Sequence, residues 1–402
     1  MKRTFIIAIN IVFCILALHA CSRPDASSAY APVELKVEEV NPSSGPFGTV
    51  VEIKGEGFSR DASKMKVLFD NRTADILSVE ESSLYVVAPE HEMGEVTVYV
   101  LKENVGIKAK YTYTKPDLYP EYPQTPVGKD FEKSCTKVSD VIWDTTYMVY
   151  PGLQFTELTL LTDANELQQI HLLKVEPDKG LSMKVCMPNN SSDISAGWKT
   201  QTLTGMTGAL KKAGQEVVAM INADFWNMTA PINPRGPVHM DGKTISSEWD
   251  YEQRVSQQAL SFAGIMNDGS PMIDYRDKYD EAKVRLTECT GGGVVMLKDG
   301  KEPEISYSAR DPRTAVGYTS DGIWWLLTAA GRGYDRASGM TYQEMGAMFK
   351  TLGCTDAVNL DGGGSAQMLI REPLSGNHVI INNPTDGKER AVINGWAVIK
   401  KK

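Results

Sequence analysis

Short runs in which apolar and polar side chains alternate dominate the chain, and this period-two pattern predicts strands. Residues 49–54, 95–100 and 109–113 alternate in this way. Turn signals separate them, among them the glycine pair of Gly55-Glu56-Gly57. Short strands at this spacing are typical of an antiparallel β-sandwich. We therefore predict an all-β domain of the immunoglobulin-like type over residues 32–114.

The pattern changes after residue 130 but stays rich in strands. Aspartate-glycine turns flanked by apolar residues recur at positions 241–242, 299–300 and 321–322, as in hairpins. Two segments have helical periodicity, residues 204–212 and residues 341–352. The second begins with Thr341 and Glu344, spaced as a capping box, which gives Glu344 a structural explanation. Residues 131–402 are therefore predicted to form one α+β domain dominated by antiparallel strands.

The segments outside these domains have their own composition. Residues 115–130 contain four prolines, which predicts a semi-stiff linker. Residues 1–20 have Lys2 and Arg3 before a short apolar run, as in a secretory signal peptide. Cys21 follows this run in a sequence that resembles a bacterial lipobox, with residues 21–31 as a polar tether.

The lipobox interpretation predicts a mature protein that is anchored to a membrane through a lipid on Cys21, in a bacterial cell envelope. It would face either the periplasm or the exterior. The alternative is an ordinary secreted protein with a chance cysteine. No other apolar run is long enough to span a bilayer.

Charge and cysteine spacing narrow the chemistry. The net charge is −9 and no basic run occurs outside the termini, which argues against nucleic acid as a partner. The cysteines that follow Cys21 lack the close pair spacing of a zinc cluster. They are Cys135, Cys186, Cys289 and Cys354, and both disulfides and free buried thiols are open to them.

The most informative stretch is 352–370. An apolar run ends in Asp361, three glycines and Ser365 follow, and a second apolar run comes next. This predicts strand, tight turn, strand. Three glycines indicate backbone close to a ligand, with N–H groups that suit an anion. The alternative is a glycine-rich hairpin in which Asp361 only caps its own turn.

Three other stretches carry candidate chemistry. Asn222 and Asp224 follow an apolar run, where a strand would end. Arg313 begins a probable strand, so it could grip phosphate in a bidentate manner or form a salt bridge with Asp311. His239 could shuttle a proton or contact a hydroxyl, and a structural histidine explains it equally well.

Taken together, these stretches resemble the phosphodiester glycosidase family, which includes the mammalian enzyme that uncovers mannose 6-phosphate by removing N-acetylglucosamine. The resemblance spans about residues 135–398. It is carried by NADFW at 222–226, Asp241-Gly242-Lys243, Gly292-Gly293 leading into Asp299-Gly300-Lys301, Arg313-Thr314-Ala315-Val316-Gly317, NLDGGGS at 359–365 and Glu389-Arg390-Ala391-Val392. Ala366 and Ala223 depart from common choices in the family. Residues 41–58 resemble the IPT/TIG family of immunoglobulin-like domains, usually spacers or binding modules.

The resemblance implies hydrolysis of a sugar–phosphate diester at the anomeric carbon–oxygen bond, which releases a free sugar of the N-acetylglucosamine type and a phosphate monoester. Asp224 and Asp361 would then be the catalytic carboxylates. The remaining residues implied for substrate or phosphate binding are Asn222, His239, Arg313, Asn359, Gly362, Gly363, Gly364 and Ser365. No cofactor or metal is implied, although the carboxylates leave room for a hard divalent cation such as calcium.

Two other classes of function remain open from the sequence. The same pocket could hold a glycan without cutting it, as in a glycan-binding surface lipoprotein. Asp224 and Asp361 could instead be ligands of a metal-dependent phosphodiesterase that cuts the phosphorus–oxygen bond. The sequence has few histidines for a transition-metal site.

Overall fold

The computed structural model describes residues 33–103, 105–115 and 122–401, and the chain divides into two compact units, residues 1–120 and 121–402. The expected signal peptide, tether and lipidation site Cys21 lie outside the described residues. Each unit is considered by itself.

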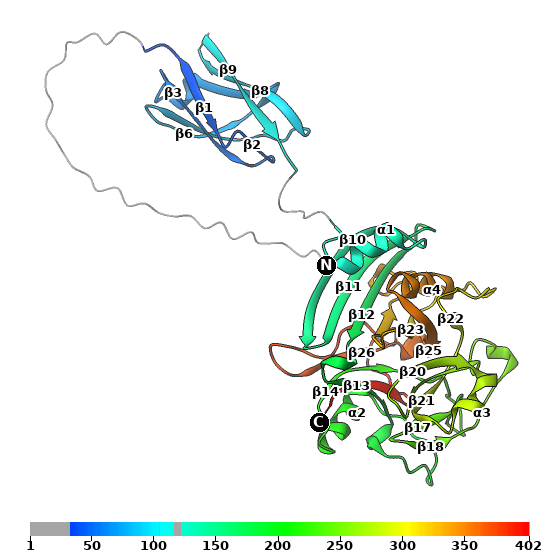
Figure 1. The fold of residues 1–402 in the computed structure, drawn as a ribbon. Helices are drawn as coiled ribbons and strands as arrows, with labels where there is room; N and C mark the ends of the chain where they lie inside the picture. Colours follow the sequence, from blue (N-terminus) through cyan, green and yellow to red (C-terminus); the bar gives the residue numbers. More distant parts are fainter. Residues whose placement is uncertain (1–32, 104, 116–121, 402) are drawn as a thin grey trace. The chain divides into compact units, whose positions relative to one another are not determined.

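The first unit is a sandwich of two sheets (Figure 1). The first sheet consists, in order, of β1 (Lys36–Asn41), β3 (Val50–Glu56), β7 (Ser83–Val87) and β6 (Asp75–Val79). The second consists of β2 (Ser44–Gly45), β9 (Val105–Tyr113), β8 (Gly94–Lys102), β4 (Met65–Phe69) and β5 (Arg72–Thr73), and η1 (Ala62–Lys64) precedes β4. All pairs are antiparallel except β2 with β9. The alternating residues of β3, β4 and β8 send one face into a shared core that includes Ile53, Val67 and Val98.

The second unit contains three larger sheets and one two-stranded ribbon, all with antiparallel pairing. The seven-stranded sheet has the order β10 (Val138–Tyr150), β11 (Leu153–Thr162), β12 (Leu167–Val175), β24 (Trp324–Ala329), β23 (Arg313–Thr319), β25 (Cys354–Leu360), β22 (Val295–Leu297). The second sheet has the order β13 (Leu181–Cys186), β28 (Gly395–Lys400), β14 (Val217–Asn222), β26 (Met368–Arg371), β27 (His378–Ile380). The third has the order β18 (Lys243–Ser246), β17 (Val238–Met240), β21 (Leu286–Gly292), β19 (Ser261–Met266), β20 (Pro271–Tyr275), and the ribbon pairs β15 (Trp226–Asn227) with β16 (Asn233–Pro234).

Helices in the described part of this unit are short. The α-helices are α1 (Pro126–Ser134), α2 (Leu203–Lys212), α3 (Tyr279–Ala282) and α4 (Tyr342–Thr351). The 3₁₀ turns are η2 (Pro177–Lys179), η3 (Pro188–Asn190), η4 (Gln253–Val255), η5 (Arg276–Lys278), η6 (Tyr334–Arg336) and η7 (Gly363–Ser365). The predicted capping box of α4 is confirmed, because the Thr341 side chain accepts from the Glu344 N–H and the Glu344 carboxylate accepts from the Thr341 N–H.

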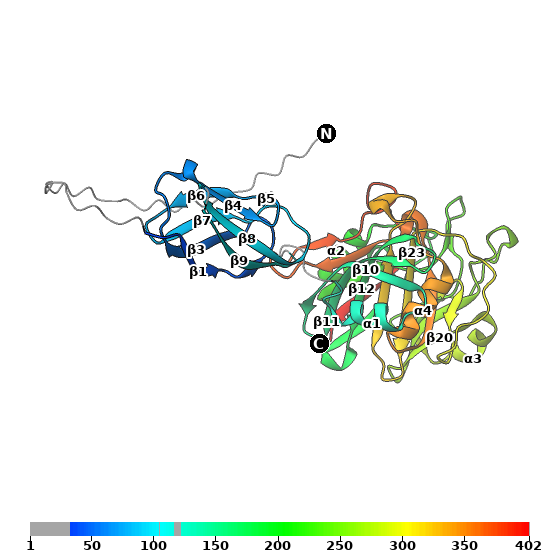
Figure 2. The same ribbon diagram turned by 90° about the horizontal axis from the view of Figure 1, so that it is seen from above.

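Alternation along β24 shows how the layers form. Trp324 and Leu326 point into a core between the seven-stranded sheet and the sheet of β14, whereas Trp325 and Leu327 point to the opposite face, which α1 and α4 cover. Both faces of this strand are buried, so its sequence is continuously apolar. A separate apolar cluster packs α2 on the outer face of the β14 sheet. Figures 1 and 2 show α1 and α4 on one side of the seven-stranded sheet and α2 away from it.

The predicted fold class is confirmed: an α+β domain dominated by antiparallel strands follows an all-β sandwich. Two details differ from expectation. The segment predicted as a linker ends in a helix. Thr125 caps α1, and the helix buries Val127 and Phe131 in the core of the second unit. The turn after Asp361 is flanked by strands but does not form a hairpin, since β25 and β26 belong to different sheets.

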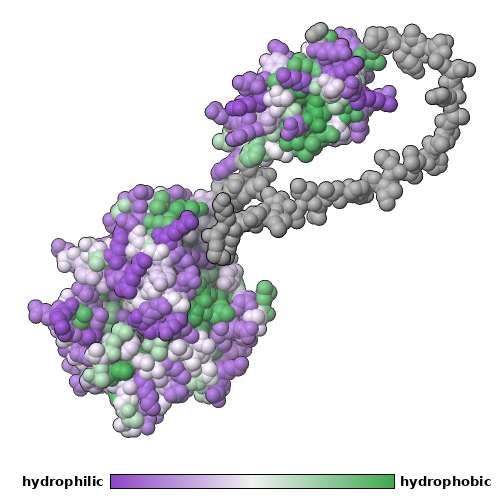
Figure 3. Space-filling model, turned by 180° about the vertical axis from the view of Figure 1, so that it is seen from behind, coloured by the Kyte–Doolittle hydropathy of each residue, from purple (hydrophilic) through white to green (hydrophobic). Residues whose placement is uncertain are grey.

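The cysteines in the described residues, Cys135, Cys186, Cys289 and Cys354, are buried and unpaired. Among the same residues, no helix combines the length and the apolar character needed to cross a bilayer. Hydrophobic side chains gather in a few patches among hydrophilic ones on the faces seen in Figure 3.

Candidate active site

A cavity of about 220 Å³ opens where the chain leaves the seven-stranded sheet and enters the sheet of β14. Its lining combines acidic, basic, amide and aromatic side chains with the glycine turn. The residues that line it are Phe225, Gln257, Gln258, Tyr307, Asp311, Arg313, Arg332, Tyr342, Asp361, Gly362, Gly363, Gly364 and Arg390. Of the residues predicted from the sequence, the structure therefore brings Asp361, Arg313 and the three glycines to one cavity.

Asn222, at the end of β14, joins the two sheets behind this cavity. Its side-chain Nδ2 donates to the Asp361 carbonyl at 2.6 Å, and its Oδ1 accepts from Thr314 Oγ1 at 2.8 Å and from the Gln367 N–H at 3.0 Å. The residue is fully buried. Because its carboxamide already has these protein partners, Asn222 positions the Asp361 segment. The geometry favours this positioning role over the substrate contact that the family resemblance implied for Asn222.

Asp361 faces the cavity from the start of the glycine turn. Burial raises its pKa to about 6, while the Ser365 hydroxyl, the Arg390 guanidinium and the Gly362 N–H act in the opposite direction. Arg390 Nη1 in turn donates to Ser365 Oγ at 3.3 Å. Asp361 therefore lies at the end of a short polar chain, and it changes protonation state close to neutral pH.

Asp224 lies behind the cavity lining and is almost completely buried. The Gly291 N–H donates to its Oδ2 at 3.1 Å, and its own N–H donates to Asn394 Oδ1 at 2.9 Å. Burial raises the pKa of Asp224 well above its usual range, and the charge of Asp361 raises it further, although the Gly291 N–H opposes this. The two carboxyl groups are therefore close enough for the charge of Asp361 to oppose the ionisation of Asp224.

The glycine turn differs from the predicted anion nest. The Gly363 N–H donates to the Pro312 carbonyl at 2.9 Å and the Ser365 N–H to the Gly362 carbonyl at 3.0 Å, so these two amides do not face a ligand. Gly363 has a φ of 57°, and a side chain at Gly364 would collide with the Arg390 guanidinium. The glycines therefore allow arginines to approach the backbone.

Arg313 lines the cavity but is held firmly by the protein. Its Nε donates to the Met340 carbonyl at 3.0 Å, Nη1 to the Tyr342 hydroxyl at 3.0 Å and Nη2 to the Ala309 carbonyl at 2.7 Å. Its guanidinium also lies 4.3 Å from the centre of the Tyr342 ring. Asp311 forms its ion pair with Arg332. The alternative prediction of an ion pair between Arg313 and Asp311 is therefore wrong.

Two arginines of the cavity were missed as site residues. Arg390 pairs through Nε and Nη2 with Asp386 at 2.6 and 2.9 Å. Arg332 donates through Nε to Asp311 at 3.0 Å, and within the described part of the chain its two terminal nitrogens have no protein acceptor. A side chain at Gly363 would lie 3.1 Å from one of them. The only local signal was the pair of glycines that flank Arg332.

Asn359 is fully buried at the end of β25, and both polar atoms of its carboxamide have no hydrogen-bond partner among the described residues. Its Nδ2 lies beside Gly293, next to the Phe225 ring and the Gln257 carbonyl. Phe225 and Gln257 line the cavity. A buried amide without partners costs folding free energy, so it indicates a group that a ligand or water satisfies.

His239 is not among the residues that line the cavity. Its Nε2 is 2.8 Å from the Tyr279 hydroxyl and its Nδ1 is 3.4 Å from Thr244 Oγ1. Burial lowers its pKa. This arrangement corresponds to the structural histidine considered from the sequence.

Within residues 33–103, 105–115 and 122–401, no group of three or more His, Cys, Asp or Glu side chains is arranged to hold a metal ion. At Asp224 the carboxylate already accepts backbone N–H groups, from Gly291 and from Gly236 and Phe225. The geometry of this carboxylate is that of a buried hydrogen-bond acceptor.

Comparison with known proteins identifies the families that the two units resemble. Residues 215–399 match the family model described as phosphodiester glycosidase, and residues 35–115 match the IPT/TIG domain model. The chain therefore carries a phosphodiester glycosidase domain with an IPT/TIG domain before it.

Among named relatives, the chain is similar to the SPbeta prophage-derived uncharacterized protein YomE of Bacillus subtilis, with 30% identity over 196 residues. The match covers 46% of this chain and 28% of that protein, so the chain spans less than a third of the length of this relative.

Two solved structures are also similar. One is the zebrafish N-acetylglucosamine-1-phosphodiester alpha-N-acetylglucosaminidase catalytic domain auto-inhibited by pro-peptide, with 18% identity over 64% of this chain and 88% of that one, and a TM-score of 0.47. The other is a hypothetical protein from Synechocystis, with 12% identity over 92% and 81% of the two chains and a TM-score of 0.43.

Proposed function

We propose that the second unit hydrolyses a sugar 1-phosphate diester at the anomeric carbon–oxygen bond and releases a free sugar, of the N-acetylglucosamine type, and a phosphate monoester. One observation carries this proposal: a titratable carboxylate, Asp361, shares a cavity with three arginines, Arg313, Arg332 and Arg390. A positively charged surface stabilises the negative charge of the departing phosphate, and a carboxylate stabilises the positive charge that the sugar ring carries in the oxocarbenium-like transition state.

The phosphate side of the cavity is assigned to the arginines. Arg332 is the best placed, because its two terminal nitrogens have no acceptor among the residues that the structure describes and lie close to Gly363. A guanidinium fork matches two phosphate oxygens. Arg313 and Arg390 are fixed by protein acceptors and supply mainly positive potential. This division of roles replaces the expectation that Arg313 and the N–H groups of the glycine turn receive the phosphate.

The carboxylate side is assigned to Asp361 with Asp224 behind it. When the anomeric carbon–oxygen bond breaks, its electron pair goes to the phosphate oxygen, whose conjugate acid has a pKa of about 6. A water oxygen then bonds to the anomeric carbon, and its proton passes to ionised Asp361. The pKa of Asp361, about 6, makes it mostly ionised at neutral pH. Asp224, which is more deeply buried, supports Asp361 from behind the cavity lining.

The sugar side is assigned to Asn359. Its carboxamide has no hydrogen-bond partner among the described residues and lies close to Gly293, as does the ring of Phe225, which lines the cavity. Sugar hydroxyls both donate and accept, so they can satisfy both of its polar atoms. A buried polar group that only the substrate satisfies also gives selectivity, because a ligand without the hydroxyl leaves it unpaired.

Hydrolysis in oxygen-18 water tests the proposal. The protein is incubated, with and without chelator, with the methyl phosphodiester of N-acetylglucosamine 1-phosphate. We expect label in the sugar and none in phosphate, with the same rate in both samples. Label in phosphate would show phosphorus–oxygen cleavage, and tight binding without turnover would show a glycan-binding protein; both results contradict the proposal.

The attachment of the chain to the envelope also stays a proposal. We propose that the mature chain begins at Cys21, carries a lipid there, and uses the IPT/TIG domain as a spacer. Mass spectrometry of the chain isolated from membranes tests this, because a diacylglycerol adduct on Cys21 is expected and an unmodified thiol would contradict it.

A further inference from the structure

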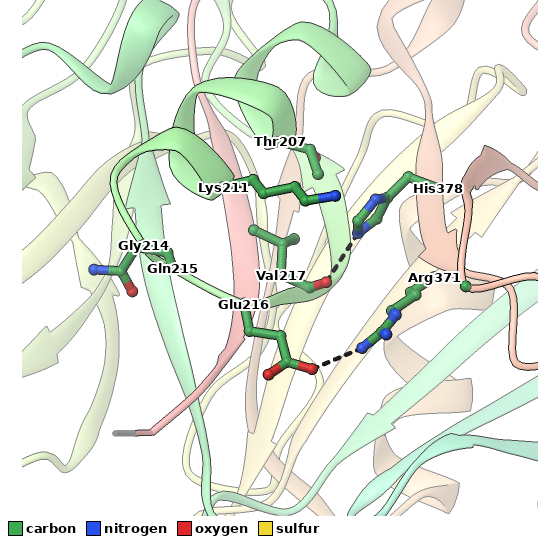
Figure 4. A pocket seen from close by; sticks show the side chains of 9 residues that line it. Thr207, Lys211, Gly214, Gln215, Glu216, Val217, Arg371 and His378 are labelled. Carbon is green, nitrogen blue, oxygen red and sulfur yellow. Dashed lines mark hydrogen bonds and ion pairs between the residues drawn. The ribbon is translucent and has the colours of Figure 1, made fainter.

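A second cavity, of about 310 Å³, lies at the other end of the two strands that lead to the candidate active site (Figure 4). β14 starts at Val217 in this cavity and ends at Asn222, and its antiparallel neighbour β26 ends at Arg371 in the same cavity. At roughly 3.3 Å per residue, Val217 and Asn222 are about 17 Å apart along the strand. The two cavities share no lining residue.

Basic side chains converge on this cavity from three elements. Lys211 comes from the last turn of α2, and Arg371 and His378 come from β26 and β27. Figure 4 shows the Lys211 amine and the His378 ring directed toward each other, with Arg371 directed toward Glu216. Thr207, Gly214, Gln215 and Gly376 complete the lining.

The single carboxylate in the lining is already paired. Glu216 Oε1 lies 2.7 Å from Arg371 Nη1, and its Oε2 lies 3.7 Å from Lys400 Nζ. His378 Nε2 is 2.9 Å from the Val217 carbonyl. Since a carbonyl can only accept, Nε2 carries a hydrogen and Nδ1 is left to face a ligand. The cavity thus has a net excess of donors and of positive charge.

We propose that this cavity is a non-catalytic binding site for a phosphoryl group. An arginine fork and a lysine are the side chains best suited to phosphate oxygens, and the His378 Nδ1 can accept from a protonated phosphate oxygen. The volume is at the lower end of small-molecule sites and exceeds what phosphate alone needs. The ligand is therefore a phosphate that carries a small organic group.

Two sources share this chemistry, a phosphorylated carbohydrate and a phospholipid headgroup. The loop between β26 and β27, which contributes Gly376, also carries Leu374 with 96% of its surface exposed. An exposed leucine beside a cationic cavity is compatible with the apolar face of a sugar and with the surface of a lipid layer. The experiment below separates the two.

Lys211 and Lys212 form a matched pair for the test. Both are exposed residues in the last turn of α2, and only Lys211 lines the cavity. Glycerol 3-phosphate is titrated calorimetrically into the full chain carrying Arg332→Ala, so that the candidate active site contributes little. Adding Lys211→Glu should weaken the remaining binding by roughly tenfold or more, whereas adding Lys212→Glu should change it less than about twofold.

Equal effects of Lys211→Glu and Lys212→Glu on binding would overturn the site, and so would the failure of both glycerol 3-phosphate and the vesicles described below to bind. The proposed function is judged separately, from the difference in glycerol 3-phosphate binding between the wild type and the variant that carries Arg332→Ala alone. Thermal melting of each variant shows that it is folded, and Arg371→Ala offers a second substitution in the cavity.

Vesicles of phosphatidylcholine with and without phosphatidylglycerol identify the source. If the chain sediments with phosphatidylglycerol vesicles, and Lys211→Glu abolishes this sedimentation while Lys212→Glu does not, the result supports the site with a lipid headgroup as its ligand. Binding of glycerol 3-phosphate without vesicle binding supports it with a soluble phosphorylated ligand. Failure of both probes contradicts it.

Discussion

Replacing Asp361 by asparagine should abolish activity and at the same time stabilise the second unit at alkaline pH. Burial raises the pKa of Asp361 from its ordinary 3.8 to about 6 in the folded protein. Below pH 3.8 the carboxyl is protonated in both the folded and the unfolded state. Between pH 3.8 and about pH 6 the folded state holds a proton that the unfolded state has released, so the free energy of unfolding falls as the pH rises.

The size of the effect follows from the shift. About two pKa units at 1.36 kcal/mol each correspond to about 3 kcal/mol, lost between pH 4 and pH 6. Water in the cavity reaches part of the Asp361 side chain, and asparagine replaces only some of its hydrogen bonds. We therefore expect Asp361→Asn to raise the free energy of unfolding by about 1–2 kcal/mol at pH 8 and by less than about 0.5 kcal/mol at pH 4.

Urea denaturation followed by tryptophan fluorescence measures this difference. All seven tryptophans lie between residues 143 and 396, so their fluorescence reports the second unit without the IPT/TIG domain. Asp268→Asn is the control, because hydrogen bonds from Ser270 lower the pKa of Asp268, and its replacement should destabilise the protein at pH 8. An Asp361→Asn variant that is no more stable at pH 8, or whose gain is the same at pH 4, would refute the reasoning.

Three further predictions concern the same site. The value of kcat/KM should rise through about pH 6 as Asp361 loses its proton, and a flat profile from pH 5 to 7 would remove Asp361 as the base. Arg332→Ala should raise KM roughly tenfold with kcat changed less than about threefold, while Arg336→Ala, on the same loop but outside the cavity, should leave both unchanged; equal effects would reject the phosphate role. Asn222→Ala should lower the free energy of unfolding by about 3 kcal/mol, because its three buried partners lose their hydrogen bonds, and a loss under about 1 kcal/mol in urea would contradict its positioning role.

Local sequence signals predicted much of the fold, because turns and strand ends are determined largely by residues that are neighbours along the chain. The aspartate-glycine turns at 241–242 and 321–322 connect β17 to β18 and β23 to β24. Arg313 does begin β23. What the sequence did not reveal depends on distant segments. The strand before Asp361 and the strand after it pair with different neighbours, and no local pattern distinguishes this from a hairpin.

The missed arginines show the same limit for the site. Arg332 and Arg390 reach the cavity from loops that lie 21 and 25 residues beyond the residues they contact, Asp311 and Ser365. Glycines flank Arg332, and Arg390 belongs to a stretch that resembles the family, but neither signal indicates which distant segment the side chain contacts. Conversely, His239 was a reasonable candidate by residue type, but only the packing of Tyr279 against it shows that its ring is engaged elsewhere.

Single-turnover release of free sugar from the methyl phosphodiester of N-acetylglucosamine 1-phosphate, compared between the wild type and a folded Asp361→Asn variant, tests the central claim most directly. The wild type should release the sugar, and the variant should do so at least roughly a hundredfold more slowly. A variant that keeps a rate within about threefold of the wild type, or a wild type that releases no sugar, would contradict the claim.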